Sequence, residues 1–168
     1  MQPRRLLLVR HAQAADGPVD QDRPLTERGG RHAAAIGAWL EQAGSVPDRV
    51  LVSPARRTAQ TWERASAVAV PGLRPIVDSR IYDNTVEGLL AAIRETPDDV
   101  QTLALVGHNP SIGELASVLD AGEGDSAAQR DVGAGFRTGG VAVFALATPF
   151  ASVEPGTATL TDFTVPGD

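Results

Sequence analysis

Short runs of consecutive apolar residues recur along this chain and restrict its possible folds. Four segments of strand length show them, at residues 6–9 (LLLV), 48–52 (DRVLV), 103–106 (LALV) and 141–146 (VAVFAL). A strand with one face in water alternates polar and apolar residues, whereas an unbroken apolar run indicates a strand covered on both faces. The runs therefore predict a central sheet buried between two other layers.

Two further segments are weaker strand candidates. Residues 157–163 (TATLTDF) alternate in the manner of a half-exposed edge strand. Residues 73–77 contain Pro75, which cannot donate a backbone hydrogen bond to a neighbouring strand.

Helical patterns fill most of the intervals between these strands. Each expected helix begins at a capping residue or a proline and carries apolar residues along one side. The expected starts are Thr26, Ser53 with Pro54, Asn84 with Glu87 as a capping box, and Pro110. The first of these helices is expected to stop at Gly44.

The alternation of strands and helices predicts an α/β fold. We expect a three-layer sandwich, with a mainly parallel central sheet and helices on both faces. Residues 120–140 are rich in Gly, Asp and Ser and are predicted to form a long loop. Strand signals continue past this loop, and 168 residues suit one compact domain, so a single domain over residues 1–168 is expected.

Composition excludes several classes of function. The chain has no cysteine, which rules out disulfides, thiolate metal sites and a cysteine nucleophile. Its net charge of −6 offers no general attraction to nucleic acid. The first apolar run is too short for a signal peptide or a membrane span, so no membrane association and a cytoplasmic location are expected.

Basic side chains and histidines follow the predicted strands. Arg10 and His11 come after the first strand, Arg56 and Arg57 after the second, and His108 after the strand at 103–106. Ligands of open α/β sheets bind beyond the carboxyl ends of the strands, so these side chains should converge. Imidazole and guanidinium groups suit a phosphoryl group, whose transition state spreads negative charge over its oxygens.

Three motifs occur in a characteristic order: RHA at residues 10–12, SPxxRT at 53–58 and GHNP at 107–110. Together they resemble the histidine phosphatase superfamily, also called phosphoglycerate mutase-like. The segments DRPLTERG at 22–29 and IYDN at 81–84 are similar to its small bacterial branch, the SixA-type phosphohistidine phosphatases. The resemblance covers roughly residues 5–147.

The resemblance implies a role for each motif residue. His11 would be the nucleophile and become phosphohistidine. Arg10, Arg57 and His108 would complete the phosphate pocket, and Asn109 would join them in binding substrate. No metal and no cofactor are expected, because the arginines would supply the positive charge. The partner would be a phosphorylated protein or a small phosphate ester, with neither nucleic acid nor membrane involved.

Simpler interpretations exist for the same residues. His11 could be a structural residue at a strand end, and His108 could cap the following helix. Asn109 could turn the chain into that helix instead of touching substrate. Arg56 is expected to be a solvated neighbour, because the family spacing within SPxxRT selects Arg57.

The chain departs from the larger branches of the family in two respects. The mutase and bisphosphatase branches carry a Ser and an Asn shortly after the nucleophile, where this chain has QAAD at residues 13–16. They also carry a Glu general acid in a longer middle region, which is missing here. The proton donor to the leaving group is therefore open among four carboxylates: Asp16, Asp22, Asp83 and Glu87.

The leading expectation is a metal-independent phosphatase that acts on a phosphomonoester or phosphohistidine through an intermediate on His11. A mutase is disfavoured by the short chain and the missing Ser and Asn. A phosphoprotein-binding module with little turnover is disfavoured by the intact motif residues. A phosphoprotein is expected over a small sugar phosphate, because no inserted subdomain would enclose a small ligand.

Overall fold

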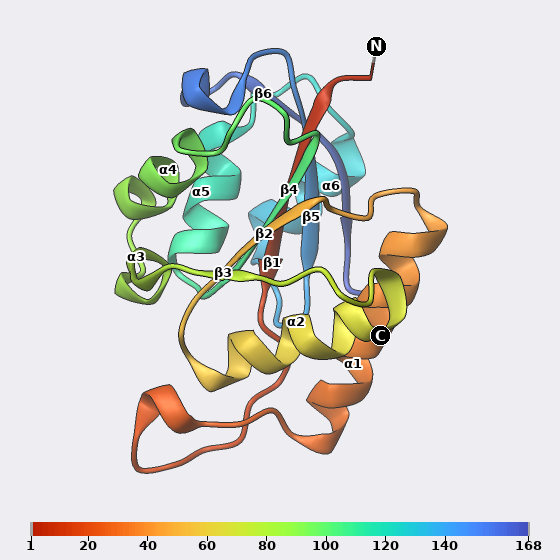
Figure 1. Ribbon diagram of the computed structural model, residues 1–168. Coiled ribbons are helices and arrows are strands. Elements are labelled where there is room, and N and C mark those ends of the chain that lie inside the picture. The colour runs from red at the N-terminus through yellow and green to blue at the C-terminus, as the bar shows by residue number, and fades with distance from the viewer. Residues whose placement is uncertain (1, 168) are drawn as a thin grey trace.

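A computed structural model describes residues 2–167 and contains one six-stranded sheet between two layers of helices (Figure 1). The strands are β1 (Arg4–Arg10), β2 (Arg49–Val52), β3 (Ile76–Val77), β4 (Thr102–Gly107), β5 (Val141–Leu146) and β6 (Ala158–Thr164). Their order in the sheet is β3-β2-β4-β1-β5-β6. The first four strands in this order pair in parallel, and β5 and β6 pair antiparallel. The predicted α/β architecture is confirmed.

The helices divide between the two faces of the sheet. They are α1 (Glu27–Gln42), α2 (Arg56–Ala69), α3 (Ser79–Asp83), α4 (Val86–Arg94), α5 (Ser111–Leu119) and α6 (Ser126–Ala134). Short 3₁₀ turns lie at η1 (Asp20–Asp22) and η2 (Phe150–Ser152). None of the helices within residues 2–167 is long and apolar enough to cross a membrane.

Both faces of the central strands are buried, which explains their unbroken apolar runs. On β1, Leu7 and Val9 pack in a core with α1 and α2, whereas Leu6 and Leu8 pack in a core with α4, α5 and α6. All four side chains are at most 1% exposed. Consecutive residues of a strand point to opposite faces, so a strand covered twice is apolar at every position.

Thr26 caps α1 as predicted, because its hydroxyl accepts a hydrogen bond from the backbone N–H of Gly29 at 2.9 Å. The prediction that Ser53 and Pro54 begin the next helix is wrong. Helix α2 begins at Arg56, and Ala55 is its N-cap residue. The Ser53 hydroxyl instead lies 2.8 Å from a ring nitrogen of His108 and also accepts a hydrogen bond from the N–H of Ala55.

The capping box expected at Asn84 and Glu87 is also wrong. Thr85 is the N-cap of α4, and its side chain accepts a hydrogen bond from Gly88. Asn84 instead ends α3 in the left-handed conformation, with φ of 66°. This conformation suits a short polar side chain and leaves the Asn84 amide free for contacts elsewhere.

The prediction of a loop throughout residues 120–140 is wrong in part, because α6 lies within it. The Asp125 carboxylate caps this helix by accepting a hydrogen bond from the N–H of Ala128. Only Ala128 and Val132 are buried along α6, so its apolar stripe is too short to stand out in a Gly-rich segment.

Candidate active site

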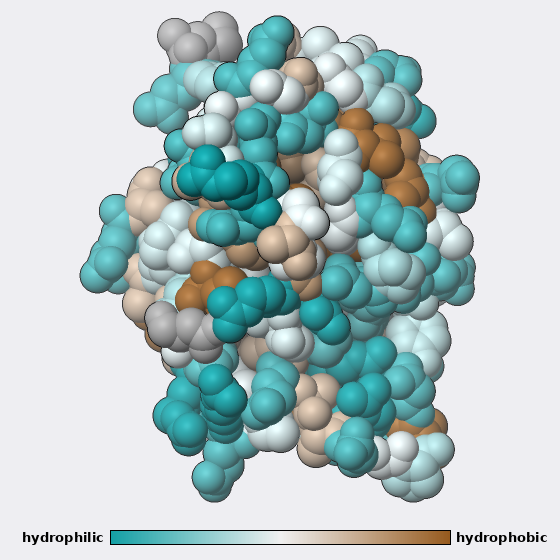
Figure 2. Space-filling view, turned by 180° about the vertical axis from the view of Figure 1, so that it is seen from behind, coloured by the Kyte–Doolittle hydropathy of each residue, from teal (hydrophilic) through white to brown (hydrophobic). Residues whose placement is uncertain are grey.

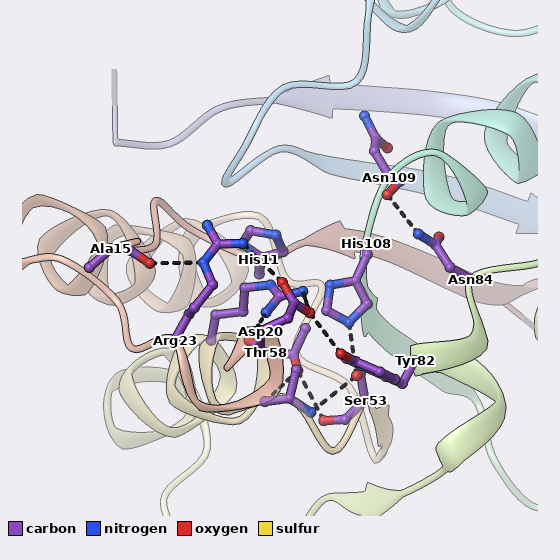
Figure 3. A network of polar contacts seen from close by, with 12 residues as sticks. His11, Ala15, Asp20, Arg23, Ser53, Thr58, Tyr82, Asn84, His108 and Asn109 are labelled. Carbon is purple, nitrogen blue, oxygen red and sulfur yellow. Dashed lines mark hydrogen bonds and ion pairs between the residues drawn. The ribbon is translucent and has the colours of Figure 1, made fainter. Parts of the chain in front are cut away.

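The register of the sheet brings the two motif histidines together. Arg10, the last residue of β1, pairs with Gly107, the last residue of β4. The next residue on each strand is a histidine, and the rings of His11 and His108 lie 5.4 Å apart between centroids. Arg57 reaches the same place from the first turn of α2. The expected convergence at the carboxyl edge of the sheet is present (Figure 3).

A cavity of about 400 Å³ lies at this edge. The side chains that line it are mostly cationic or hydrogen-bonding groups. They are Arg10, His11, Asp20, Arg23, Arg57, Tyr82, Asn84, His108 and Asn109. The five residues expected to bind or attack phosphate are all among them. Arg56 is exposed and is not among them.

The hydrogen bond made by His11 fixes which of its ring nitrogens carries the proton. Its Nδ1 lies 2.7 Å from the carbonyl oxygen of Ala12, and a carbonyl can only accept, so Nδ1 carries the ring proton. Nε2 therefore keeps its lone pair. Burial, together with the charges of Arg57 and Arg10, lowers the pKa of His11 to about 4. The ring is thus neutral at neutral pH, with an unprotonated Nε2.

His108 is 4% exposed and is held by a side chain from a neighbouring strand end. Its Nε2 lies 2.8 Å from Ser53 Oγ, which already accepts a hydrogen bond from the N–H of Ala55. When the Ser53 hydroxyl donates to Nε2, the ring proton of His108 lies on Nδ1. Nδ1 is buried and has no partner among the described residues. His108 thus has one buried N–H without a partner among these residues, and its ring borders the cavity.

Burial is the main reason that the pKa of His108 is lowered, to about 3, and the positive charge of Arg57 adds to it. The ring is therefore neutral in the free protein. A bound phosphate dianion would oppose the effect of the arginines and favour the protonated ring.

The two motif arginines are anchored by different parts of the chain. Arg10 Nη1 donates to the carbonyl oxygen of Phe136 at 3.0 Å, and its buried Nε has no partner within residues 2–167. Arg57 is 7% exposed and donates from Nη1 and Nη2 to the carbonyl oxygen and carboxylate of Asp20, at 2.8 and 3.1 Å. A guanidinium has five N–H donors, so three on Arg57 remain for an anion.

Asp20, which belongs to none of the sequence motifs, joins several parts of the site (Figure 3). Its Oδ2 accepts hydrogen bonds from the Tyr82 hydroxyl at 2.7 Å and from Arg57, and its Oδ1 accepts from Arg23 at 3.1 Å. The hydrogen bonds from Tyr82 and Arg57 hold the pKa of Asp20 at about 2. The carboxylate is therefore ionised at neutral pH.

None of the four carboxylates considered as proton donors lines this cavity. Asp16 and Asp22 line a separate hollow along residues 16–24. Glu87 lies in a groove of about 900 Å³ bordered by α4, α5 and α6, and Asp83 is exposed at the end of α3. Figure 2 shows hydrophobic residues at the surface in its upper right, on the side of the molecule where α4 and α5 lie.

Asn109 has contacts that fit both interpretations of it. Its Nδ2 donates to the carbonyl oxygen of Phe136 at 2.9 Å and its Oδ1 accepts from the N–H of Gly113, so it shapes the turn into α5. It also borders the cavity. Asn84 supports the same turn, since its amide donates to the carbonyl of Asn109 and accepts from the N–H of Ser111.

Fold and site together define an α/β protein with a cavity lined by histidine and arginine side chains at the carboxyl edge of its sheet. Residues 6–143 match the histidine phosphatase superfamily (branch 1). The chain belongs to this superfamily.

Two relatives are similar to this chain over most of its length. The chain is 30% identical over 128 residues to the phosphohistidine phosphatase SixA of Escherichia coli strain K12, which covers 71% of this chain and 76% of the relative. It is 38% identical over 161 residues to an uncharacterized protein of Mycobacterium tuberculosis, covering 94% and 99% of the two chains.

Solved structures of SixA proteins share the whole fold. A proposed SixA from Nakamurella multipartitia superposes with a TM-score of 0.87 at 31% identity, over 99% of this chain and 98% of the other. The protein histidine phosphatase SixA complexed with tungstate gives a TM-score of 0.79 at 26% identity, over 96% and 97%.

Proposed function

We propose that this protein is a metal-independent phosphatase that hydrolyses phosphohistidine, or a phosphomonoester, through a phosphohistidine intermediate on His11. The observation that carries the proposal is the state of His11. Its proton is held on Nδ1 by the carbonyl of Ala12, its lone pair lies on Nε2, and it borders a cavity with Arg10 and Arg57.

In the first step, the lone pair of His11 Nε2 forms a bond to phosphorus as the bond to the leaving group breaks. The proton on Nδ1 stays in its hydrogen bond to Ala12. The phosphorylated ring is therefore cationic, and the Ala12 carbonyl stabilises this charge. No base is needed to activate the nucleophile, because Nε2 is already unprotonated.

The remaining groups of the cavity bind the transferred phosphoryl group. N–H groups of Arg10, Arg57 and His108 would donate to its equatorial oxygens, where charge accumulates in the transition state. The related SixA structure with tungstate supports this assignment, since tungstate is a tetrahedral oxyanion like phosphate. Three arginines around one cavity supply positive charge that a metal ion supplies in other phosphatases.

In the second step, water attacks phosphorus and the electron pair of the P–N bond returns to His11 Nε2. The ring leaves as neutral imidazole, because its second nitrogen has kept a proton throughout. The proton of the attacking water passes to the phosphate product. The same reasoning supports phosphohistidine as substrate, because an imidazole protonated on its other nitrogen leaves without a carboxylic acid nearby.

The test is the His11→Ala variant, compared with His32→Ala as a matched control in α1. His11→Ala should lower turnover of an aryl phosphate and of a phosphohistidine protein by several powers of ten, because it removes the nucleophile. His32→Ala should leave both rates within about twofold, since His32 is outside the cavity. Wild-type enzyme quenched during turnover should carry acid-labile phosphate. Full activity in His11→Ala, or acid-stable label on serine, would refute the proposal.

A further inference from the structure

Asp20 is the only carboxylate among the residues that line the cavity, within the part of the chain that the structure describes. A carboxylate in an anion pocket repels the phosphoryl group that the pocket is proposed to bind. Asp20 anchors Arg57 and Arg23, but its exposed carboxylate also faces any molecule that enters the cavity. Asp20 also lies in a 3₁₀ turn outside the three motifs that define the pocket.

The hydrogen bonds of Asp20 leave room for one more donor. The two oxygens of a carboxylate accept about four hydrogen bonds in all. Tyr82 and Arg57 donate to Oδ2, and Arg23 donates to Oδ1, so one position on Oδ1 remains. The side chain is 52% exposed, so a bound molecule can reach that oxygen from the solvent side.

The depths of the side chains indicate which part of a substrate meets Asp20. His108 and Arg57 are buried at the inner end of the cavity, whereas Asp20 lies at its exposed rim. A phosphoryl group bound by the inner groups would direct its leaving group outward, since the entering and leaving atoms lie roughly in line. The leaving group would therefore pass beside Asp20.

We propose that Asp20 determines specificity for the leaving group, by accepting an N–H from a protonated nitrogen leaving group and disfavouring an anionic oxygen leaving group. This inference rests on the proposed phosphatase function and names the bond that is broken, phosphorus–nitrogen in place of phosphorus–oxygen. A phosphohistidine side chain has the required chemistry.

The step balances without any further proton donor. The substrate imidazole carries phosphorus on one nitrogen and a proton on the other, and it donates that proton as a hydrogen bond to Asp20 Oδ1. As His11 Nε2 bonds to phosphorus, the P–N electron pair returns to the substrate ring, which leaves as neutral imidazole. An oxygen leaving group would instead gain negative charge beside the carboxylate. The low pKa of Asp20 agrees with a role as acceptor and not as acid.

The test compares two substrates in one variant. Asp20→Asn keeps the size of the side chain and removes its charge. The ratio of kcat/KM for a phosphohistidine peptide to kcat/KM for p-nitrophenyl phosphate should fall at least about tenfold, which corresponds to about 1.4 kcal/mol in transition-state energy. A structural defect, or a general change in phosphate affinity, would alter both substrates together and leave the ratio unchanged.

Two control variants sharpen the comparison. Asp22→Asn removes a charge from the same 3₁₀ turn, away from the cavity, and should leave the ratio unchanged. Asp20→Glu retains the carboxylate and should restore part of the ratio. An unchanged ratio in Asp20→Asn, or an equal fall in Asp22→Asn, would overturn the role of Asp20 alone. Absence of turnover in the wild-type protein, or full activity in His11→Ala, would instead overturn the phosphatase function itself.

Discussion

His108 is buried, His11 is largely buried, and both lie near guanidinium groups; burial and the nearby positive charge each favour the neutral ring. For His11 the pKa falls to about 4, with burial as the largest cause. Only the neutral ring can attack phosphorus. We therefore expect kcat/KM to fall on the acid side with a midpoint below about 6.5, the ordinary histidine value. The measurement is kcat/KM against pH with an aryl phosphate.

The same experiment gives a second midpoint from kcat. Bound phosphate raises the pKa of nearby histidines, so the acid limb of kcat should lie at higher pH than the limb of kcat/KM. The pKa of the aryl phosphate is measured in a titration without enzyme, so that protonation of the substrate is not assigned to the enzyme. An acid limb of kcat/KM well above neutral pH would contradict a His11 held neutral by burial and by the charges of Arg57 and Arg10.

Ser53 acts on the site through His108 and is a positioning residue. In Ser53→Ala, His108 Nε2 loses its partner, and the ring can carry its proton on either nitrogen. We expect kcat for a small aryl phosphate to fall about tenfold, because a lost buried hydrogen bond costs about 1–3 kcal/mol. Ser66→Ala is the matched control, because Ser66 lies within α2 and its hydroxyl donates to the backbone carbonyl of Glu63 at the surface. Equal effects in both variants would show that His108 is held by other contacts.

Helices α1 and α2 touch each other at a glycine, and this contact supports the wall of the cavity that carries Arg57. A Cβ on Gly37 would overlap the carbonyl oxygen of Ala65. Gly37→Ala should therefore lower the free energy of unfolding by about 1–3 kcal/mol, as overpacking does in other cores. Urea unfolding, with equal slopes for both proteins, measures the difference.

Gly133 provides the matched control for that substitution. It lies on the exposed side of α6, and a Cβ there would meet no atom within 4 Å. Gly133→Ala should raise the free energy of unfolding by about 0.5–1 kcal/mol, because alanine has the higher helix propensity. A stabilised Gly37→Ala would show that α1 and α2 can separate without cost.

The sequence predicted elements well where one local signal decided the outcome. Buried strands gave unbroken apolar runs, and Thr26 capped the helix that followed it. The sequence-based predictions of helix starts were wrong where a polar side chain has a partner far away in the sequence. Ser53 contacts His108, which is 55 residues away, and Asn84 contacts the turn at Asn109, which is 25 residues away. Local rules assign such residues to the nearest helix, because they cannot include contacts that only the fold creates.

Asp20 was missed for the same reason. Its partners Arg57 and Tyr82 lie 37 and 62 residues further along the chain, so no spacing rule connects them. The motif arginines and histidines were found because each follows a strand whose carboxyl end lies at the edge of the sheet. Sheet topology thus predicted the inner part of the cavity, whereas its rim depends on loops whose course has no local signal.

At the scale of the whole molecule, a net charge of −6 contrasts with the arginines gathered at one cavity. These cations are covalently part of the chain, so a chelator cannot remove them. We expect activity on an aryl phosphate to survive prolonged treatment with EDTA unchanged within about twofold. Loss of activity that returns only when a divalent ion is added would contradict a site in which Arg10 and Arg57 supply the charge.

The two site histidines also link the stability of the molecule to pH. Their pKa values are about 4 and about 3 in the folded protein, whereas an unfolded chain has a histidine pKa of about 6.5. Below about pH 6.5 the unfolded chain therefore binds more protons than the folded one, and the free energy of unfolding falls as the pH is lowered toward 5. The slope reaches at most about 1.4 kcal/mol per pH unit for each histidine.

Urea unfolding of the wild type at several pH values between 7 and 5 measures this slope, and a double variant with Asn in place of His11 and His108 should show a much shallower one. Equal slopes in the two proteins would show that the site histidines become protonated without cost in the folded state.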